Sequence, residues 1–474
     1  MRLTFITLLA CLSAAYAQPA KEDIIKVIDS KYDVYASMAH KIWEFAEVGY
    51  QEEKSSAILQ KELAKEGFKI EAGVAGMPTA FIASYGQGKP VIGVLGEFDA
   101  LPGISQEAVP ELKPIAGKEA GHACGHHLFG TASAAAAIAV KNWMIKNKIA
   151  GTLRFYGTPA EEGGSGKVYM VRDGLFKDVD AVLHWHPSAA NDASAGSSLA
   201  NKSGKFRFYG VASHAAGSPE RGRSALDGVE AMNNMVNMLR EHVPQETRIH
   251  YVITSGGEAP NVVPAYAEVY YYVRHPRRDE VKSIWERVEK AAQGAALGTG
   301  TRVEVEVTGG VYDLLPNETL ARLMDANLRT VGGYTYTEQE KEFGQKIQQS
   351  FTGKIPSLEI TNQISAFQMR GGLGGSTDVG DVSWVVPTAG LGTATWVPGT
   401  AAHSWQAVAA GGMSIGHKGM MVAAKTIALT LTDLFTNPEQ IQKAIKELKE
   451  RTGSDFKYEA LLGDRKPALN YRMK

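Results

Sequence analysis

Apolar positions recur along the first part of the chain with the spacing of helices and strands. From residue 21 to about residue 48 they come at three- and four-residue steps, which predicts one long amphipathic helix, and a second helix follows at about residues 55–66. The run Val91–Phe98 is largely apolar, as is typical of a strand buried on both faces of a parallel sheet. Further strands are predicted at residues 79–85, 151–157 and 181–187, and a helix at the alanine-rich residues 131–148. This alternation indicates an α/β domain.

A different pattern begins near residue 203. Strands are predicted at residues 205–209, 248–253, 267–274 and 301–308, and helices at residues 224–241 and 277–296. The order β-α-β-β-α-β over about 110 residues is typical of a ferredoxin-like sandwich. Helices are predicted again from residue 317 and at residues 337–350 and 413–435. We therefore expect an α/β domain in two halves, residues 18–203 and 311–474, with the sandwich inserted as residues 204–310.

The first 17 residues have the pattern of an export signal. Arg2 is followed by the apolar run Leu3–Leu12 and by Ala15-Tyr16-Ala17, a small-x-small cleavage pattern, which predicts a secretory signal peptide over residues 1–17. The apolar run is too short for a stable transmembrane helix. A buried N-terminal helix is one alternative, and a lipoprotein processing site at Leu8-Leu9-Ala10-Cys11 is another. We expect an exported protein, periplasmic or secreted.

Composition and charge narrow the function classes. The 474 residues are 44% hydrophobic and carry a formal net charge of −1, which leaves no basic face for nucleic acid. No stretch after the leader is expected to cross a membrane. Once Cys11 leaves with the leader, Cys124 is the one remaining cysteine, so the mature chain cannot form an internal disulfide. Cys124 must then be buried, bound to a metal or reactive, and metal ligation protects a thiol best in an oxidising compartment.

The string around Cys124 carries the strongest chemical signal. Cys124 stands two residues before His126, within residues 121–130 and directly ahead of a predicted helix. A thiolate and an imidazole at this spacing can face one point, and both are good ligands for borderline-soft divalent metals. Two ligands do not make a site, so the chain must supply others.

Other candidate ligands follow predicted strands or lie in loops. Glu161 and Glu162 come after the strand at residues 151–157 and before glycines that leave both carboxylates at the sheet edge, although a solvated loop is the alternative. His184 and His186 end the next strand, and alternation places both on the same side, so the pattern does not separate ligand from neighbour. His403 lies in the loop of residues 396–405.

Together these residues suit a pair of metals. Five ligands are too many for one tetrahedral zinc, and a thiolate can bridge two ions: Cys124, His126, Glu162, His186 and His403. Paired divalent ions polarise a carbonyl and activate water, which is how an amide is hydrolysed without a protein nucleophile. Glu161 is then free to act as a general base toward water and as an acid toward the leaving amine.

Five strings, in order along the chain, resemble one enzyme family. They are Gly96-Glu97-Phe98-Asp99-Ala100-Leu101-Pro102, Cys124-Gly125-His126, Pro159-Ala160-Glu161-Glu162, Trp185-His186-Pro187 and Ser213-His214-Ala215-Ala216. They resemble peptidase family M20, the co-catalytic metallo-aminoacylases and carboxypeptidases, in the amidohydrolase branch that includes auxin-conjugate hydrolases and N-acyl amino acid deacylases. Residues 157–187 and 376–384 look most like the p-aminobenzoyl-glutamate hydrolase type. The resemblance covers nearly all of the chain after the leader.

The resemblance implies a fold, a cofactor and a reaction. The fold would be a zinc-peptidase-like α/β catalytic domain with a central mixed sheet, plus an inserted ferredoxin-like dimerisation domain, or lid. Two divalent ions per subunit, zinc or manganese, would be bound by Cys124, His126, Glu162, His186 and His403, with Glu161 as the base. This choice favours His186 over His184. The chain would release a free amino acid from a small N-acyl or aminobenzoyl amino acid or a peptide, as a homodimer or with a related second subunit.

The resemblance also implies roles for residues of the lid. His214 would reach into the partner subunit's site and stabilise the tetrahedral oxyanion, and Asn261 and Arg274 would hold the substrate. A guanidinium suits a carboxylate because its fork donates two parallel hydrogen bonds, so Arg274 is the candidate for the carboxylate of the amino acid.

Two departures from the family pattern and three rival functions remain. Other branches carry a metal-binding histidine at the position of Glu97, which is left out of the ligand set, and an aspartate is common where His127 stands. Asp99 and His127 are expected to hold the metal ligands in position without binding a metal themselves. The rivals are a metal-dependent dipeptidase or carboxypeptidase, a thiol hydrolase using Cys124 and His126, and a non-catalytic exported metal- or peptide-binding protein.

Overall fold

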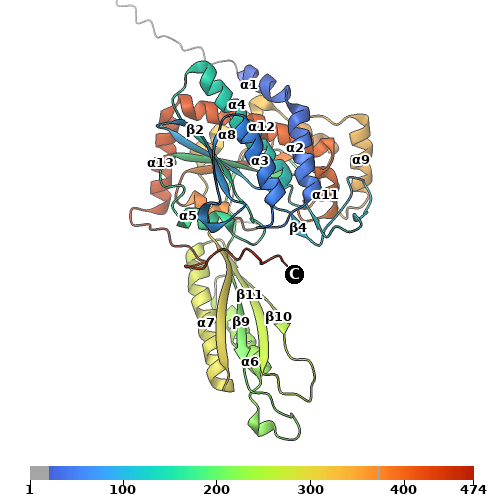
Figure 1. Ribbon diagram of the computed structural model, residues 1–474, viewed down its shortest axis with the longest axis vertical. Helices are drawn as coiled ribbons and strands as arrows, with labels where there is room; N and C mark the ends of the chain where they lie inside the picture. Colours follow the sequence, from blue (N-terminus) through green and yellow to red (C-terminus); the bar gives the residue numbers. More distant parts are fainter. Residues whose placement is uncertain (1–20, 371–373, 474) are drawn as a thin grey trace, which may run out of the picture.

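The computed structural model describes residues 21–370 and 374–473, which form a larger body and a lid that extends away from it (Figure 1). The expected signal peptide and part of the glycine-rich segment at residues 371–375 lie outside the described residues. The larger body is built from both ends of the chain, and the lid from its middle.

A six-stranded mixed sheet forms the centre of the larger body. Its order is β1-β2-β6-β3-β7-β14, with bounds β1 Lys69–Ala72, β2 Phe81–Gln87, β6 Gly151–Gly157, β3 Val91–Gly96, β7 Ala181–Ser188 and β14 Thr388–Ala394. Strands β6, β3, β7 and β14 run parallel, whereas β2 is antiparallel to both of its neighbours. The carboxyl ends of β3, β6 and β7 therefore meet at one edge, where open α/β sheets hold their ligands.

Helix α4 (His126–Asn147) lies against this sheet with its first turn close to the end of β3. A Cβ at Gly130 would come within 2.8 Å of the Glu97 carbonyl oxygen, so a larger residue would push the helix away. Among the described residues, α4 alone is long and apolar enough to cross a membrane by length and composition, yet 89% of that window is buried inside the protein. Our expectation that no segment after the leader reaches that threshold was wrong for α4, whose position is that of a core helix.

The other elements of the larger body pack around the sheet. The helices are α1 Lys21–Asp29, α2 Tyr32–Phe45, α3 Glu53–Lys65, α5 Gly166–Arg172, α8 Glu318–Val331, α9 Glu338–Gln348, α10 Val379–Ser383, α11 Trp405–Gly411, α12 Ser414–Thr436 and α13 Pro438–Thr452. Two short two-stranded sheets pair β4 Leu101–Pro102 with β5 Ala120–Gly121, and β8 Ala195–Gly196 with β13 Met369–Arg370. Helix α12 packs along α4 and completes the core.

The single long helix expected at residues 21–48 is two helices. Helix α1 ends at Asp29 and α2 begins at Tyr32, with Lys31 at φ −106° and ψ 16° between them. The Ser30 hydroxyl donates to the Val27 carbonyl, a local bond that competes with continuation of the helix. The apolar spacing continues across the break, which is why the pattern did not reveal it.

The lid has the β-α-β-β-α-β order that the sequence predicted. Its elements are β9 Ala200–Tyr209, α6 Ala225–Leu239, β10 Arg248–Ser255, β11 Tyr266–His275, α7 Arg278–Thr299 and β12 Arg302–Val311. The sheet order β10-β11-β9-β12 is antiparallel throughout, which is the ferredoxin-like arrangement. Phe206, Tyr271 and Trp285 are buried between the sheet and the two helices and form a core separate from that of the larger body.

Candidate active site

Cys124 lies in the short loop between β5 and α4. Gly125 adopts φ 78°, and a Cβ there would come within 2.8 Å of Pro187, so the turn places the thiol against the end of β7. Cys124 is buried, and its Sγ lies 3.2 Å from His186 Nε2. Burial lowers the pKa of His186 to about 4, which keeps the ring neutral and able to act as a ligand near neutral pH.

His126, the first residue of α4, is held by two carboxylates that follow β3. Its Nδ1 lies 2.8 Å from Asp99 Oδ1, and its Nε2 lies 3.0 Å from Glu97 Oε2. Asp99 Oδ2 also accepts a hydrogen bond from the Glu162 backbone N–H at 2.9 Å. Asp99 thus orients one candidate ligand through its ring and another through its backbone, as carboxylates behind metal-binding histidines do.

Glu161 and Glu162 lie in a strained turn after β6. Ala160 (φ 56°), Gly163 (φ 93°) and Ser165 (φ 59°) adopt the left-handed region, which costs a non-glycine residue about 1–3 kcal/mol. Burial raises the pKa of Glu161 well above its usual range, and the nearby carboxylates of Glu97 and Glu162 raise it further. Strain of this kind persists where surrounding contacts enforce it, and such positions cluster at functional sites.

His403 reaches the same turn from the loop before α11. Its backbone adopts φ 59°, and its N–H donates to the Ala123 carbonyl at 3.0 Å, which fixes the loop beside Cys124. The Nε2 of His403 lies 3.1 Å from Glu162 Oε1. Ser404 caps α11 by accepting from the Ala407 N–H, so the helix begins directly after the histidine.

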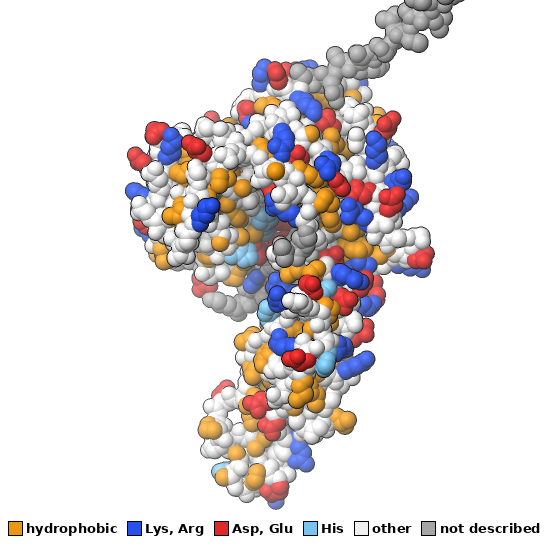
Figure 2. All heavy atoms as spheres, turned by 180° about the vertical axis from the view of Figure 1, so that it is seen from behind, with side chains coloured by type: hydrophobic (Ala, Val, Ile, Leu, Met, Phe, Trp, Pro, Cys, Tyr) orange, Lys and Arg blue, Asp and Glu red, His pale blue; other side chains and the backbone are white. Residues whose placement is uncertain are grey.

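The candidate ligands form two groups that share Cys124. One group is Cys124, His126 and His186, the other is Cys124, Glu162 and His403, and within each group the ligand atoms lie within 4.8 Å of one another. A third group of the same compactness joins Glu97, His126 and Glu161. All five residues expected as ligands are therefore brought together from four separate segments of the chain. In Figure 2 histidine side chains show in a recess of the larger body near the lid.

The donor set fits divalent cations. His126 Nε2, Glu97 Oε2 and Glu162 Oε1 are buried, and none of them makes a hydrogen bond of good geometry to a described residue. Buried polar atoms are normally satisfied, so unsatisfied ligand atoms that converge on one place indicate a missing partner. A thiol, imidazoles and carboxylates are the ligands of zinc and of related metals, and a cation would offset the negative charge gathered here.

The sequence did not predict a group of buried charged residues that lies next to the candidate metal ligands. Lys167 on α5 is fully buried, and its Nζ lies 2.7 Å from Glu97 Oε1 and 2.6 Å from Asp378 Oδ1. Burial alone would lower the pKa of Lys167, but Asp378 and Glu97 raise it. Glu97 joins the third group of potential ligands although it was left out of the expected set. The polar character of Lys167 gives no sequence signal that it is buried.

His127 points away from the ligand groups. It is buried, its Nε2 lies 3.0 Å from the Gly411 carbonyl oxygen, and its ring packs against His122 at 4.8 Å between centroids. Its hydrogen bond therefore ties α4 to α11, the helix that follows His403. His127 therefore supports the loop that carries His403. Its hydrogen bond is not to any of the five candidate metal ligands.

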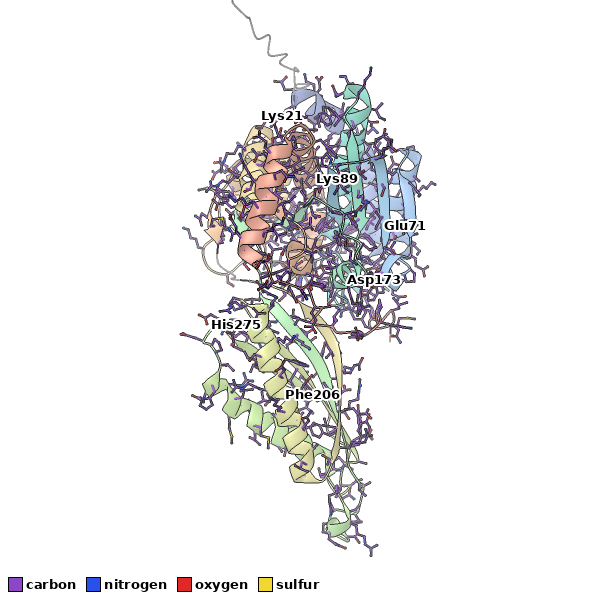
Figure 3. The ribbon with its side chains drawn as sticks, turned by 90° about the vertical axis from the view of Figure 1, so that its left-hand side faces the viewer. Lys21, Glu71, Lys89, Asp173, Phe206 and His275 are labelled. Atoms are coloured by element: carbon purple, nitrogen blue, oxygen red, sulfur yellow. The ribbon has the colours of Figure 1, made fainter. Side chains whose placement is uncertain are left out.

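The lid residues of the expected site lie at opposite ends of the lid. Arg274 pairs with Asn201 where β11 and β9 leave the larger body, and Figure 3 shows the neighbouring His275 at this junction. His214 and Asn261 are exposed in loops beyond the other end of β9, whose ten residues span about 33 Å. The structure therefore does not bring His214 or Asn261 to the metal-ligand groups of the same chain.

Comparison with known proteins places this arrangement in a family. Residues 200–299 match the model of a peptidase dimerisation domain. The chain is 42% identical over 461 residues to the B subunit of p-aminobenzoyl-glutamate hydrolase from Escherichia coli, an alignment that covers 91% of this chain and 96% of the relative. The chain belongs to the M20 peptidase family. This M20 protein is a hydrolase of amide bonds, and the family and enzyme class expected from the five sequence strings are confirmed.

Other proteins resemble this chain in sequence or in fold. The M20 chain is 29% identical to the human Xaa-Arg dipeptidase, over 93% of this chain and 94% of the relative. The aminobenzoyl-glutamate utilization protein of Klebsiella pneumoniae matches with a TM-score of 0.60 at 17% identity, covering 86% of this chain and 98% of that one. A dinuclear metal-binding M20 peptidase of Bacillus subtilis matches with a TM-score of 0.58 at 17% identity, covering 86% and 99%. The predicted fold class is confirmed.

Proposed function

We propose that this M20 hydrolase is an exported two-metal amidohydrolase that releases a free amino acid from an N-acyl or aminobenzoyl amino acid. The observation that carries the proposal is that two compact ligand groups share the Cys124 sulfur. One thiolate common to two sets of ligands is the arrangement that a bridging ligand between paired cations requires. The relative with 42% identity, which is named for aminobenzoyl-glutamate, supports the substrate class.

Cys124, His126 and His186 would hold one ion, and Cys124, Glu162 and His403 the other, with zinc or manganese as the candidates. Bound divalent cations supply Lewis-acid polarisation of the amide carbonyl and make water more acidic. The N-terminal pattern of residues 1–17 supports export to the periplasm or the outside of the cell.

Glu161 is the proposed proton carrier. It is half-buried beside Glu97 and His126, and its carboxylate belongs to neither of the two groups that share Cys124. Glu161 takes a proton from the attacking water as its oxygen bonds to the amide carbon. The same proton then passes to the nitrogen as the C–N bond breaks, which leaves an amine and a carboxylic acid.

The lid would complete the site across a dimer. His214 and Asn261 are exposed at the far end of the lid, so they are free to enter a second subunit, where His214 would stabilise the developing oxyanion. Arg274, at the junction, would bind the substrate carboxylate; its Nε is buried without a hydrogen bond to a described residue. The second subunit would be another copy of this chain or a related one, since relatives named for both subunits of p-aminobenzoyl-glutamate hydrolase are similar to it.

A dipeptidase is the second candidate. The mouse and human Xaa-Arg dipeptidases are each 29% identical over more than 90% of this chain, so a dipeptide is a reasonable substrate. The two candidate activities would use the same metal site. They differ in the group that is attached to the carbonyl carbon of the cleaved amide.

A substrate panel tests the proposal. Protein reconstituted with zinc or manganese is assayed against p-aminobenzoyl-glutamate, N-acyl amino acids and dipeptides that end in arginine. We expect the highest kcat/KM with an aminobenzoyl or N-acyl amino acid, and loss of all activity with a chelator. Preference for a dipeptide would favour the second candidate. Activity that survives full metal removal would instead support a thiol hydrolase, and no activity on any member would support a binding protein.

A further inference from the structure

The C-terminal tail, residues 454–473, returns from α13 to the active site. In Figure 1 it crosses between the larger body and the lid before it ends. The Arg172 guanidinium on α5 donates to the carbonyls of Gly463 at 3.0 Å and Arg465 at 2.7 Å. Further along, the Gln51 amide donates to the Leu469 carbonyl at 2.8 Å. The tail is therefore bound along its length by side chains of the larger body.

The last side chains of the tail bind the turn that carries Glu161 and Glu162. The Tyr471 hydroxyl donates to the Glu162 carbonyl at 3.0 Å, and Arg472 Nη2 donates to the same oxygen at 2.6 Å. The contact is closely fitted, because a Cβ at Gly49 would come within 2.2 Å of the Tyr471 hydroxyl oxygen. The Tyr471 ring packs edge-on against Tyr50 at 5.6 Å between centroids.

These two bonds add to others that the larger body makes to the backbone of the turn. The Glu162 N–H donates to Asp99, and the Ala160 N–H donates to Glu52 Oε1 at 2.8 Å. Tyr50 donates to the Gly164 carbonyl at 2.8 Å. With the tail in place, both the N–H and the carbonyl of Glu162 are fixed, so the direction in which its side chain leaves the turn is fixed too. Without the tail, the strained φ angles at Ala160 and Ser165 could relax.

We propose that Tyr471 and Arg472 are positioning residues that hold the Glu161–Glu162 turn in its working geometry from the C-terminal end of the chain. The inference rests on the proposed roles of Glu161 and Glu162. Tyr471 and Arg472 touch no reacting atom; they fix the carbonyl of Glu162, and with it the short backbone segment from which the side chains of Glu161 and Glu162 project.

The test compares a Tyr471→Phe/Arg472→Gln double variant with Met473→Ala, which alters an exposed residue of the same tail. We expect the double variant to lose about ten- to a hundredfold in kcat while its KM changes less than about twofold, because misplaced catalytic groups mainly slow the chemical step. Arg472→Lys, which keeps a donor for the same carbonyl, should retain most of the kcat. Met473→Ala should behave as the wild type.

A second readout does not depend on activity. In metal-free protein, hydrogen exchange of the backbone amides in residues 158–166 should be faster in the double variant, with exchange in the lid unchanged. A wild-type kcat together with wild-type exchange in the turn would overturn the inference. So would a change in KM alone, or faster exchange throughout the molecule, which would show a merely structural role. If the wild type cleaves nothing on the panel, the proposed function fails while the exchange result still decides whether the tail holds the turn.

Discussion

Cys124 Sγ lies 3.2 Å from His186 Nε2, although 62 residues separate them along the chain. The loop before α4 and the end of β7 meet there because β3 and β7 are neighbours in the sheet and α4 packs across both. The thiol is also part of the group with Glu162 and His403. Its loss should therefore disturb both groups at once, whereas the loss of any one histidine removes a ligand from one.

Cys124→Ala should lose metal and activity together. We expect kcat/KM to fall at least about a hundredfold, since even residues behind a ligand commonly cost 10–100-fold in metal affinity or activity. Metal content per subunit is measured by elemental analysis after gel filtration. Ser133→Ala is the matched control, because Ser133 is a buried residue of α4 whose hydroxyl has no hydrogen-bond partner among the described residues. Full metal content in Cys124→Ala would exclude the thiol as a bridge.

Glu161→Gln should separate metal binding from turnover. The amide keeps the size of the side chain but cannot take a proton, so kcat should fall about 10²- to 10⁴-fold with metal content unchanged. Glu338→Gln, on the exposed surface of α9, is the control. A variant that turns over at the wild-type rate would remove Glu161 from its proposed role.

His214→Ala should slow the reaction while leaving the dimer intact. Because His214 lies at the far end of its own lid, we expect it to act in the other subunit, so mixed dimers of His214→Ala and Glu161→Gln chains should recover activity. Such a dimer holds one site with both residues intact, so purified mixed dimers should show about half of the wild-type activity. The measurement uses two differently tagged chains that are co-expressed and purified through both tags. Mixed dimers as inactive as either parent would show that His214 acts within its own chain, if it acts at all.

Asp381 should make stability depend on pH. It is buried, its Oδ1 accepts from the Tyr458 hydroxyl at 2.7 Å, and burial raises its pKa from 3.8 to about 7. Between these pH values the folded state keeps a proton that the unfolded state has lost, so the free energy of unfolding falls as pH rises from about 4 to about 7. Asp381→Asn, which is neutral at every pH, should lack this part of the fall.

Melting temperatures at pH 5 to 8 test this prediction. The wild type should lose stability relative to Asp381→Asn as pH rises, and Asp455→Asn, at an exposed position of the tail, should follow the wild type. Parallel curves for the wild type and Asp381→Asn would show that Asp381 does not carry the proton.

Local sequence patterns were enough to predict most of the helices and strands. Strand β6 was predicted at the residues where it is found, and the lid elements to within a few residues, because alternation and helical spacing are properties of neighbours in the chain. Strand β14 was missed, since its Thr-Ala-Gly-Leu-Gly-Thr-Ala sequence has small residues where a β-branched run would signal a strand. Its glycines leave room for the neighbouring strand: a Cβ at Gly390 would come within 2.3 Å of His184 Nε2. That requirement is a contact between strands, which no local pattern carries.

The expected metal ligands were predicted from short sequence strings, whereas the residues that contact them come from distant parts of the chain. Cys124 and His126 were recognisable from spacing and residue type. Lys167 was not, because its burial depends on two carboxylates at remote positions, one of them Asp378. Arg472 could not be found either, because a terminal tail rich in polar residues predicts no contact until the chain is folded. The candidate metal ligands can therefore be predicted from sequence patterns. The residues that hold them in place cannot, because their contacts form only in the folded chain.

The metal content of the purified protein decides whether two cations share the Cys124 sulfur. Elemental analysis should find two divalent ions per subunit, with amidase activity that disappears on removal of both and returns when zinc or manganese is added back. Full activity in protein shown to hold no metal, or saturation at a single ion per subunit, would show that Cys124 does not bridge a pair of cations.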